Sequence, residues 1–441
     1  MTLTPARTAL ACARMGASLL ASAIAFQAAP AMAAALDARS LGLGRAQLAL
    51  DVAASTAWTN AALLGLPSAQ QAMMAPLPGL SLGLGNDAFG FQTLDALLSG
   101  KALSDADARQ LSASIPASGL GLKLDFGSAL GVSAPMHRSG FFVRASADTV
   151  GLAVPRDLLT LLLLGNSVTS AVSIDALQGA RADAFADVGF SVGVPVAFSG
   201  ARATALGLTA RYIQGIGFAR ITEARGKLLE THADGSFSGE AQATYQYGTM
   251  GAGGALDLSL ASEVRDDLRL VATLGNIGAV RWPKITEKHH TYRLEPYQLG
   301  FSGDDAQFSA GAPSTTTTEA PGPGNDQELW DPLPLKLGFG ARWIPLRSLP
   351  LQLLGDVELG TGRAYGVSTQ PEVRLGGEWR LIDWLPLRAG LSAGGERATS
   401  FTTGLGLELG ACRVDLAIGS YDGLFAASKG GYYALASQFK F

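Results

Sequence analysis

The second half of the chain alternates apolar and polar residues with a period of two, and the charges of each segment fall on one side of the alternation. From Pro334 onward the pattern runs almost unbroken. A period of two is typical of β-strands, whose successive side chains point to opposite faces of a sheet. A charged side chain that faces lipid costs ~2–4 kcal/mol at the middle of a bilayer. The sequence therefore predicts membrane-spanning strands whose apolar face meets lipid and whose charged face lines a lumen.

The charged positions of these strands define the predicted lumen. They are Lys336, Arg342, Asp356, Glu358, Glu372, Arg374, Glu378, Arg380, Arg388, Arg413 and Asp415. Both signs occur on neighbouring strands, which is typical of ion pairs that fill a barrel. An ion-selective pore, the alternative, would favour one sign. We therefore expect a filled rather than an open lumen along this part of the wall.

The last residues of the chain repeat the strand pattern. Tyr433, Leu435, Phe439 and Phe441 alternate with small or polar residues. A strand edge in a membrane must find a partner, and closure onto the first strand provides one. The pattern is similar to the C-terminal assembly signal of bacterial outer-membrane barrels, although Ala436 stands where that signal usually has Gly. We expect a closed, all-β transmembrane barrel that these four residues help to assemble, and the alternative is an edge strand of a soluble β-sandwich.

The N-terminal residues 1–33 have the features of a secretory signal peptide. Arg7 and Arg14 precede an apolar run over 15–26, and Ala31-Met32-Ala33 follows as a small-x-small cleavage pattern. No run in the sequence reaches the ~18 apolar residues of a membrane-spanning helix. Export together with a terminal aromatic strand favours the outer membrane of a Gram-negative-type cell.

Charge and cysteine content exclude some partners. The net charge of the whole chain is −4, and removal of Arg7 and Arg14 with the signal makes it about −6 (−4 minus 2). Because no basic stripe is present to neutralise phosphates, we expect no nucleic-acid partner. Cys12 lies in the predicted signal, so Cys412 is alone in the mature chain and has no partner for an intramolecular disulfide.

The sequence offers little for catalysis. Its four histidines fall in predicted turns and loops, and they are His137, His232, His289 and His290. The adjacent pair lacks a third metal ligand at useful spacing, and a serine hydrolase needs a histidine on a strand face. The glycine-rich stretches at Gly42 and Gly251 do not begin a helix after a strand, so a phosphate loop is not supported. We predict no enzyme activity, no metal and no cofactor.

About fourteen strands are expected, an even number that returns both termini to the periplasm. Seven follow Pro334, and the upstream ones are expected at 120–132, 139–147, 187–198, within 204–231, 239–249, 255–264 and 268–282. Short periplasmic turns are predicted at 233–235, 265–267, 347–349, 382–384 and 410–411, and longer connections at 360–370, 394–400 and 420–431. The longest connection, 283–331, contains a threonine run and a Pro-Gly repeat, which favour a solvated extracellular loop.

Five tryptophans mark the expected membrane interfaces. Trp343, Trp379 and Trp384 lie near predicted short turns, whereas Trp282 and Trp330 border the long loop. Transmembrane barrels have aromatic belts at both interfaces. Two belts are therefore predicted.

Two segments lack the strand pattern. Residues 86–113 contain Ser104-Asp105-Ala106-Asp107, which is typical of a helix start. Residues 155–183 open with Pro155 and continue with a leucine-rich run. Both are expected to form short helices on the periplasmic side or inside the barrel.

A motif near the predicted mature N-terminus resembles the opening of the FadL-like outer-membrane proteins. It comprises Arg39, Ser40, Gly42, Gly44, Arg45 and Asn60. The resemblance implies a hatch inside a barrel, although Ala61 stands where the family has proline after the asparagine. The helical insert and the Asn276-Ile277-Gly278 stretch before Trp282 look more like the conjugal-transfer TraF-like and uncharacterised members.

The residue patterns and the resemblance together imply a domain organisation. It comprises a signal peptide (1–33), an N-terminal hatch and helical segment (34–118) and a transmembrane barrel (119–441) with a helical insert (155–185) and the long extracellular loop (283–331). Arg39 and Arg45 are expected to pair with lumen carboxylates such as Glu358, Glu372 or Glu378. The alternative is a mobile periplasmic tail.

Two functions remain open from the sequence. The hatch motif favours passive uptake of small hydrophobic molecules through a plugged lumen. The periplasmic helices and the charge-filled lumen favour a non-enzymatic assembly or interaction component of a conjugal-transfer or secretion-type system. The expected partners are outer-membrane lipids, the barrel-assembly machinery, and either a hydrophobic small molecule or an envelope protein, with the barrel itself a monomer.

Overall fold

A computed structural model defines most of the chain beyond the predicted signal. It describes residues 37–50, 53–68, 72–90, 93, 104–164, 171–232, 237–297, 300–302, 305–307, 314–321, 328–346, 348–395, 399–423 and 427–441. The predicted signal peptide, 1–33, lies outside the described residues and stays a prediction. The same holds for Arg347 in one of the predicted turns.

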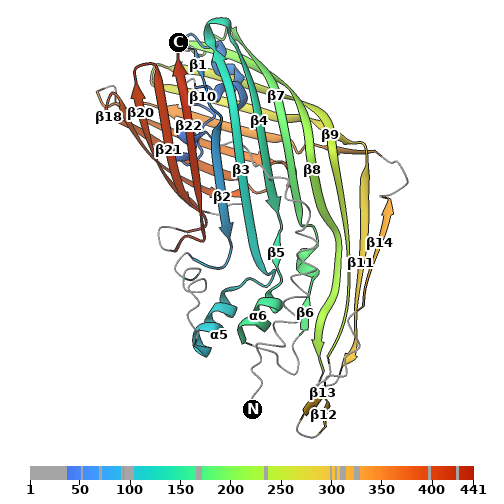
Figure 1. Cartoon of the computed structure of the whole chain (residues 1–441). Coiled ribbons are helices and arrows are strands. Elements are labelled where there is room, and N and C mark those ends of the chain that lie inside the picture. Colours follow the sequence, from blue (N-terminus) through green and yellow to red (C-terminus); the bar gives the residue numbers. More distant parts are fainter. Residues whose placement is uncertain are drawn as a thin grey trace.

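Fourteen strands in the described part of the chain form a closed antiparallel ring (Figure 1). In ring order they are β2 (Gly79–Asn86), β3 (Leu120–Ala134), β4 (Ser139–Val150), β7 (Arg181–Val196), β8 (Ala203–Thr231), β9 (Phe237–Arg265), β10 (Leu268–Trp282), β16 (Lys336–Trp343), β17 (Leu351–Gly360), β18 (Glu372–Ile382), β19 (Leu385–Gly394), β20 (Ser400–Leu409), β21 (Cys412–Ser420) and β22 (Gly430–Lys440). The ring closes where β22 pairs with β2, with Leu435 opposite Leu80 and Tyr433 opposite Leu82. The predicted closed, all-β barrel of about fourteen strands is confirmed.

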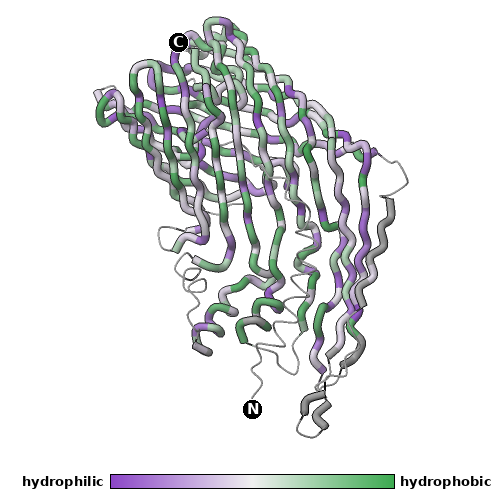
Figure 2. The backbone as a smooth tube through the Cα atoms, viewed as in Figure 1, coloured by the Kyte–Doolittle hydropathy of each residue, from purple (hydrophilic) through white to green (hydrophobic). Residues whose placement is uncertain are grey.

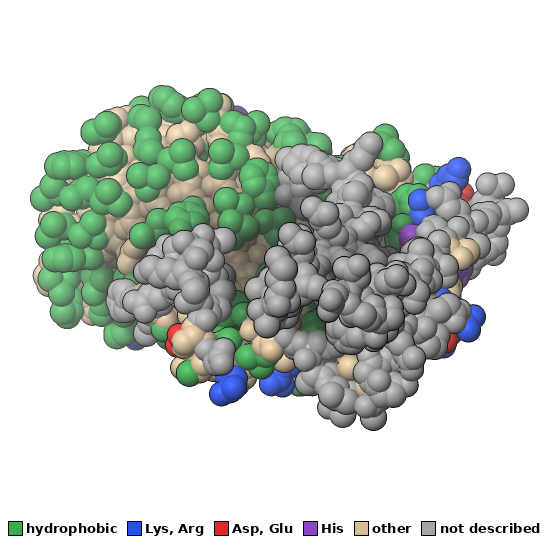
Figure 3. All heavy atoms as spheres, turned by 60° about the horizontal axis from the view of Figure 1, so that its bottom comes forward, with side chains coloured by type: hydrophobic (Ala, Val, Ile, Leu, Met, Phe, Trp, Pro, Cys, Tyr) green, Lys and Arg blue, Asp and Glu red, His purple; other side chains and the backbone are tan. Residues whose placement is uncertain are grey.

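Each strand presents an apolar face to the outside and a polar or small-residue face to the lumen. On β22, Tyr433 and Leu435 are 53% and 47% exposed, whereas Tyr432 and Ala434 are 2% and 5% exposed. The alternation is visible along the wall in Figure 2. Hydrophobic side chains cover the barrel wall in Figure 3, and charged side chains gather toward one end. No helix in the described part of the chain is long and apolar enough to cross a bilayer.

The two ends of the barrel differ. Short turns gather at the end that holds the C-terminus, at the top of Figure 1. At the opposite end β8 and β9, 29 residues each, extend past their neighbours. There the sheet continues through β11 (Ile285–Tyr297) and β14 (Ser314–Pro321), while β6 (Ala171–Ser173) joins β8. We call these the short-turn end and the long-connection end.

Smaller elements complete the chain. They are β1 (Met73–Met74), β5 (Ala153–Val154), β12 (Gly300–Ser302), β13 (Asp305–Gln307), β15 (Leu329–Pro332), the helices α2 (Ala38–Gly42), α3 (Thr56–Thr59), α5 (Asp105–Ser114) and α6 (Arg156–Leu164), and the 3-10 turns η1 (Ala61–Gly65), η2 (Pro135–His137) and η3 (Asp175–Leu177). Helix α5 begins at the predicted capping box, because Ser104 and Asp107 exchange side chain-to-backbone hydrogen bonds.

The predicted position of the helices is wrong. Helices α5 and α6 lie beside one another at the long-connection end, and Ser112 and Thr160 share a hydrogen bond of 2.9 Å. They follow β2 and β4, both of which run away from the short turns, so neither helix can lie on that side. The predicted insert 155–185 is also too long, since α6 ends at Leu164 and β7 begins at Arg181.

The predicted number of strands is correct, although two of the individual strand assignments are wrong. The strands predicted at 239–249 and 255–264 are one strand, β9, which passes through Gly251 to Gly254 without a turn. Conversely β2 belongs to the ring, so the barrel does not begin at residue 119. The predicted turn at 233–235 lies outside the described residues, but the strands that flank it meet at the long-connection end, not the short-turn end.

The described residues of the long connection include paired strands, which differs from the predicted solvated loop. The run of threonines at 315–318 lies in β14, which pairs with β11 from Thr286 to Arg293. Threonine is β-branched and fits a strand well, and this favoured pairing over a disordered loop. The predicted interface position of Trp282 is also wrong, since this residue is 1% exposed and points into the lumen. Trp330, by contrast, is 62% exposed.

Candidate functional site

The lumen contains the start of the described chain. Residues 37–50 and 53–66, here called the N-terminal segment, lie inside the barrel and are almost entirely buried. Helix α2 packs against β20 and β21, and η1 packs against β7 and β8 on the opposite wall. The segment therefore crosses the lumen from one wall to the other.

An arginine-carboxylate pair ties helix α2 to the wall. Arg39 donates from Nε and Nη2 to the two carboxylate oxygens of Glu378, each at 2.9 Å. Arg388 donates to the same carboxylate at 2.7 Å. Arg39 and Glu378 are both almost completely buried. A two-pronged arginine-carboxylate pair in a buried site is strong and directional, so it fixes the position of α2.

A second set of contacts holds the next turn of the segment. Arg45 Nη1 lies 2.9 Å from Glu372 Oε1. The carboxylate of Asp356 accepts the backbone N–H groups of Gln47 and Leu48 at 2.6 and 3.0 Å. Asp356 was predicted as a lumen charge, but its use as a backbone acceptor could not be foreseen from its sequence position.

The glycines of the motif allow a close approach between segment and wall. Gly44 has a φ of +65°, and an added Cβ would lie 2.6 Å from the carbonyl oxygens of Leu375 and Leu391. A Cβ on Gly42 would lie 2.9 Å from Gly404 Cα. Only glycine combines this conformation with this space, which explains why the motif requires glycine at both positions.

Ser40 and Asn60 complete the motif through local hydrogen bonds. Ser40 Oγ donates to the carbonyl oxygen of Asp37 at 2.8 Å. Asn60 Oδ1 accepts from Ala62 N at 3.1 Å and begins η1, while its amide donates to Leu48 O at 2.8 Å. The turn thus forms with Ala61 in place of the proline of the family motif.

Further lumen charges form a continuous network beside α2. Arg413 donates to Asp415 at 2.8 Å, and Arg388 Nη1 lies 2.8 Å from the other oxygen of Asp415. Arg413 also lies 3.2 Å from Glu408. The structure thereby joins β19, β20 and β21 through side chains, as well as through backbone hydrogen bonds.

The other predicted lumen charges lie nearby. Arg374 and Lys336 both contact Glu358, and Arg380 and Arg342 are half-buried. All eleven predicted lumen charges are thus buried or half-buried. The four predicted assembly residues of β22 and its end (Tyr433, Leu435, Phe439 and Phe441) are exposed on the outer face.

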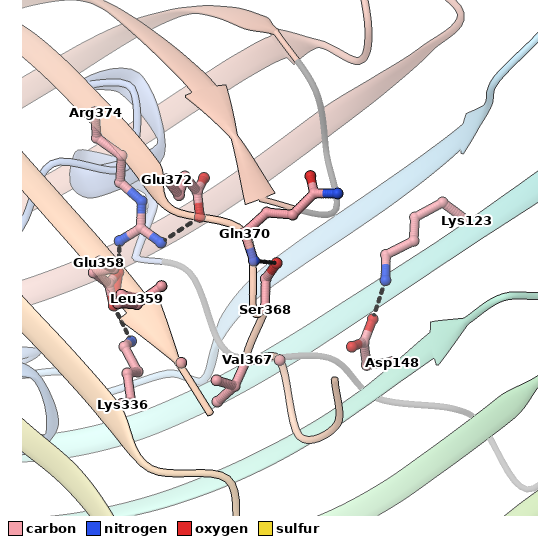
Figure 4. A pocket seen from close by; sticks show the side chains of 12 residues that line it. Lys123, Asp148, Lys336, Glu358, Leu359, Val367, Ser368, Gln370, Glu372 and Arg374 are labelled. Carbon is pink, nitrogen blue, oxygen red and sulfur yellow. Dashed lines mark hydrogen bonds and ion pairs between the residues drawn. The ribbon is translucent and has the colours of Figure 1, made fainter. Parts of the chain in front are cut away.

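A small polar cavity of about 30 Å³ lies on the long-connection side of these charges (Figure 4). One wall holds the ion pair of Lys123 and Asp148, at 2.6 Å. Across the space lie Glu358, Glu372 and Arg374. The formal charges of its lining residues balance, so the cavity suits neutral or dipolar solutes rather than ions of one sign.

A loop of residues 361–370 separates this cavity from a buried aromatic cluster. The cluster is built from Phe185, Ile213, Phe218, Ala255, Val280, Trp282, Ile285, Leu333, Ala364 and Tyr365. On its other side the loop contributes Val367, Ser368 and Gln370 to the cavity. The cluster was not predicted, because its members are far apart in the sequence and no local pattern connects them.

A charge cluster on the upstream strands was also missed. Arg211 donates to Asp187 at 3.0 Å and to Asp257 at 2.8 Å, and Arg144 also contacts Asp187. Asn276, in the left-handed region with a φ of +66°, accepts from Arg211 at 2.6 Å. The aspartates within otherwise apolar strands were the sequence feature that could have predicted this cluster.

Among the titratable groups outside the spanning strands, Asp37 and Tyr365 have shifted pKa values. Burial raises the pKa of the Asp37 carboxyl above its ordinary value, and the neighbouring Asp415 carboxylate raises it further. Burial also raises the pKa of the Tyr365 phenol, and the Asp331 carboxylate adds to the shift. Tyr365 is therefore a neutral donor at physiological pH.

The described residues contain no group of three or more His, Cys, Asp or Glu side chains suited to a metal ion. His289 bonds Thr244 and lies 3.0 Å from Glu287, and His290 stacks on Tyr245 with ring centroids 5.3 Å apart. These contacts account for both histidines as sheet side chains.

Comparison with known proteins gives similar solved structures only. No protein-family model and no curated protein matches the chain. The toluene transporter TodX of Pseudomonas putida is 10% identical over 92% of this chain and 97% of its own, with a TM-score of 0.47. The CymD monoaromatic hydrocarbon channel is 12% identical over 92% and 96%, with a TM-score of 0.46. A FadL homologue of Pseudomonas aeruginosa is 10% identical over 93% and 99%, with a TM-score of 0.45.

Proposed function

We propose that this chain is an outer-membrane channel whose N-terminal segment is a hatch, and that small hydrophobic molecules pass through it passively. The observation that carries the proposal is the position of residues 37–50 and 53–66 inside the lumen, tied to the wall by Arg39 and Arg45. The hatch motif that resembles FadL-like proteins supplies these same contacts.

The nature of the cargo follows from the two sides of the lumen. The wall from β16 to β21 is filled with paired charges, whereas β7, β8 and β10 carry the aromatic cluster. Ion pairs disfavour an apolar solute, and apolar walls with few polar groups are typical of small-molecule sites. The aromatic cluster is therefore the part of the lumen that suits a hydrophobic molecule, because the same strands carry the paired charges of Arg211, Asp187 and Asp257 elsewhere along their length. The alternative of an assembly component is not supported by these findings.

The test is deletion of residues 36–64 followed by conductance measurement in planar bilayers, with the intact barrel as control. The deletion barrel is expected to conduct more, because the segment no longer crosses the lumen. Correct folding is checked by membrane fractionation and by heat-modifiable migration on gels. Unchanged, near-zero conductance from a folded deletion barrel would show that wall charges close the lumen, and the hatch would lose its support.

A further inference from the structure

The aromatic cluster contains one aromatic ring that does not come from a strand of the wall. Phe185, Phe218 and Trp282 belong to β7, β8 and β10, whereas Tyr365 belongs to the loop between β17 and β18. These strands lie on a different part of the ring from β17. The loop therefore reaches across the lumen to place a phenol ring in an apolar pocket that other strands build.

Every recorded contact of the Tyr365 side chain is one that a free phenol could make. Its ring centroid lies 5.2 Å from that of Phe185, at an angle of 57°. The guanidinium of Arg181 lies 5.3 Å from the ring centroid. The hydroxyl donates to Asp331 Oδ2 at 2.9 Å, and Arg181 donates to that same oxygen at 2.6 Å. The site thus offers an aromatic wall, a cation over the ring face and a carboxylate acceptor.

The loop adopts a strained conformation to insert this ring. Tyr365 has a φ of +54° and Gly366 has a φ of +70°. The left-handed region costs a residue with a side chain ~1–2 kcal/mol. The loop is closed by local hydrogen bonds, Val367 N to Ala364 O at 3.0 Å and Gly360 N to Ser368 O at 2.9 Å. The ring can therefore leave with its loop while the strand pairing of the barrel stays intact.

Trp282 provides a second observation that points to a ligand. It is 1% exposed, and its indole N–H has no hydrogen-bond partner among the described residues. An unsatisfied buried donor costs ~1–3 kcal/mol. Trp282 packs against Phe218 in the same cluster, with ring centroids 4.7 Å apart, so the cluster that holds Tyr365 also contains an unused buried donor.

We propose that the aromatic cluster is a binding site for a small phenol-like aromatic molecule, and that Tyr365 occupies it in the unliganded protein. An entering ligand displaces the loop, which also borders the polar cavity through Val367, Ser368 and Gln370 (Figure 4). Displacement therefore joins the cluster to the cavity. An apolar cavity of ~150 Å³ is known to be large enough for benzene. This inference rests on the proposed function, because the site would bind the hydrophobic molecule during its passage through the barrel.

The test measures binding of 4-methylphenol, the side-chain analogue of tyrosine, to the detergent-solubilised barrel by titration calorimetry. Tyr365→Gly is expected to bind it about tenfold more tightly than the intact protein, because a site occupied by its own side chain binds in proportion to its vacant fraction. Glycine also tolerates the left-handed backbone at this position. Tyr212→Gly, which removes a tyrosine exposed on the outer wall, is the matched control for partition into detergent.

A second variant tests the polar part of the site. Combining Tyr365→Gly with Asp331→Ala is expected to reduce the preference for 4-methylphenol over toluene by about fivefold, since the hydroxyl loses its acceptor. If a correctly folded Tyr365→Gly barrel binds 4-methylphenol no better than the intact protein or Tyr212→Gly, the inference is wrong. Binding is measured without transport, so this outcome is separate from failure of the hatch deletion to conduct.

Discussion

At the scale of single residues, buried ion pairs hold the N-terminal segment and the lumen wall together, and the loss of one charge leaves its partner buried and unpaired. Glu378 is 1% exposed and accepts hydrogen bonds from Arg39, Arg388 and Gln352. A buried ion pair is not a large source of stability in itself, because both ions lose their hydration. Removal of one partner is nevertheless costly, since it leaves the other charge buried without compensation.

Glu378→Gln is therefore expected to destabilise the barrel by ~3–5 kcal/mol, because Arg39 and Arg388 stay charged and buried without the carboxylate that neutralised them. The measurement is the urea midpoint of the folded barrel in lipid vesicles. Glu328→Gln is the control, since Glu328 pairs with Arg281 while both side chains are over 40% exposed, and such pairs are worth ~0–1 kcal/mol. Equal midpoints for the two variants would contradict the account of Glu378.

Asp37 gives a prediction about pH. Its folded-state pKa is raised by burial, so the folded protein binds more protons than the unfolded chain between the two pKa values. Stability contributed by this group falls as pH rises through that window. Asp37→Asn is expected to raise the urea midpoint at pH 7.5, and the gain should disappear as pH falls below the folded pKa. A gain that persists unchanged at low pH would show that charge is not its cause.

At the scale of elements, the sequence pattern succeeds where strands are short and alternate strictly. The seven strands after Pro334 were all predicted, because each alternates an exposed apolar face with a buried polar or small-residue face. The pattern fails in β9, where Gly251 to Gly254 resemble a turn but allow backbones to pack, since a Cβ on Gly253 would lie 2.2 Å from Ala279 O. Strand β2 did alternate, with Leu80, Leu82 and Leu84 exposed, and this signal was overlooked.

The fit of the N-terminal segment to the wall can be tested without touching its charges. Gly44→Ala is expected to displace the segment, because its Cβ meets two wall carbonyls at 2.6 Å, and to raise conductance in planar bilayers above that of the intact barrel. Gly410→Ala is the matched control, since Gly410 has a similar φ of +61° but nothing within 4 Å. An increase in both variants would indicate general loosening rather than loss of this contact.

At the scale of the whole molecule, sequence reasoning identified the participants of the site better than their arrangement. Arg39 and Arg45 were expected to meet lumen carboxylates, and they contact Glu378 and Glu372, more than 300 residues away. The opposite charges of these arginines and glutamates were enough to predict that they pair. The aromatic cluster had no such signal, because apolar side chains have no complementary sign and Tyr365 reaches Phe185 only through closure of the ring.

The apolar outer surface leads to a prediction about how the cost of a lysine on this surface depends on its depth in the bilayer. Leu416, within β21, and Leu409, beside the tight turn between β20 and β21, are 51% and 66% exposed. Lysine on the lipid face costs ~2–4 kcal/mol at mid-depth and ~0–1 kcal/mol near an interface. Leu416→Lys is therefore expected to reduce the free energy of folding into vesicles by several times more than Leu409→Lys. The measurement is the urea dependence of folding in lipid vesicles, and equal losses for the two variants would mean that this face does not meet a bilayer.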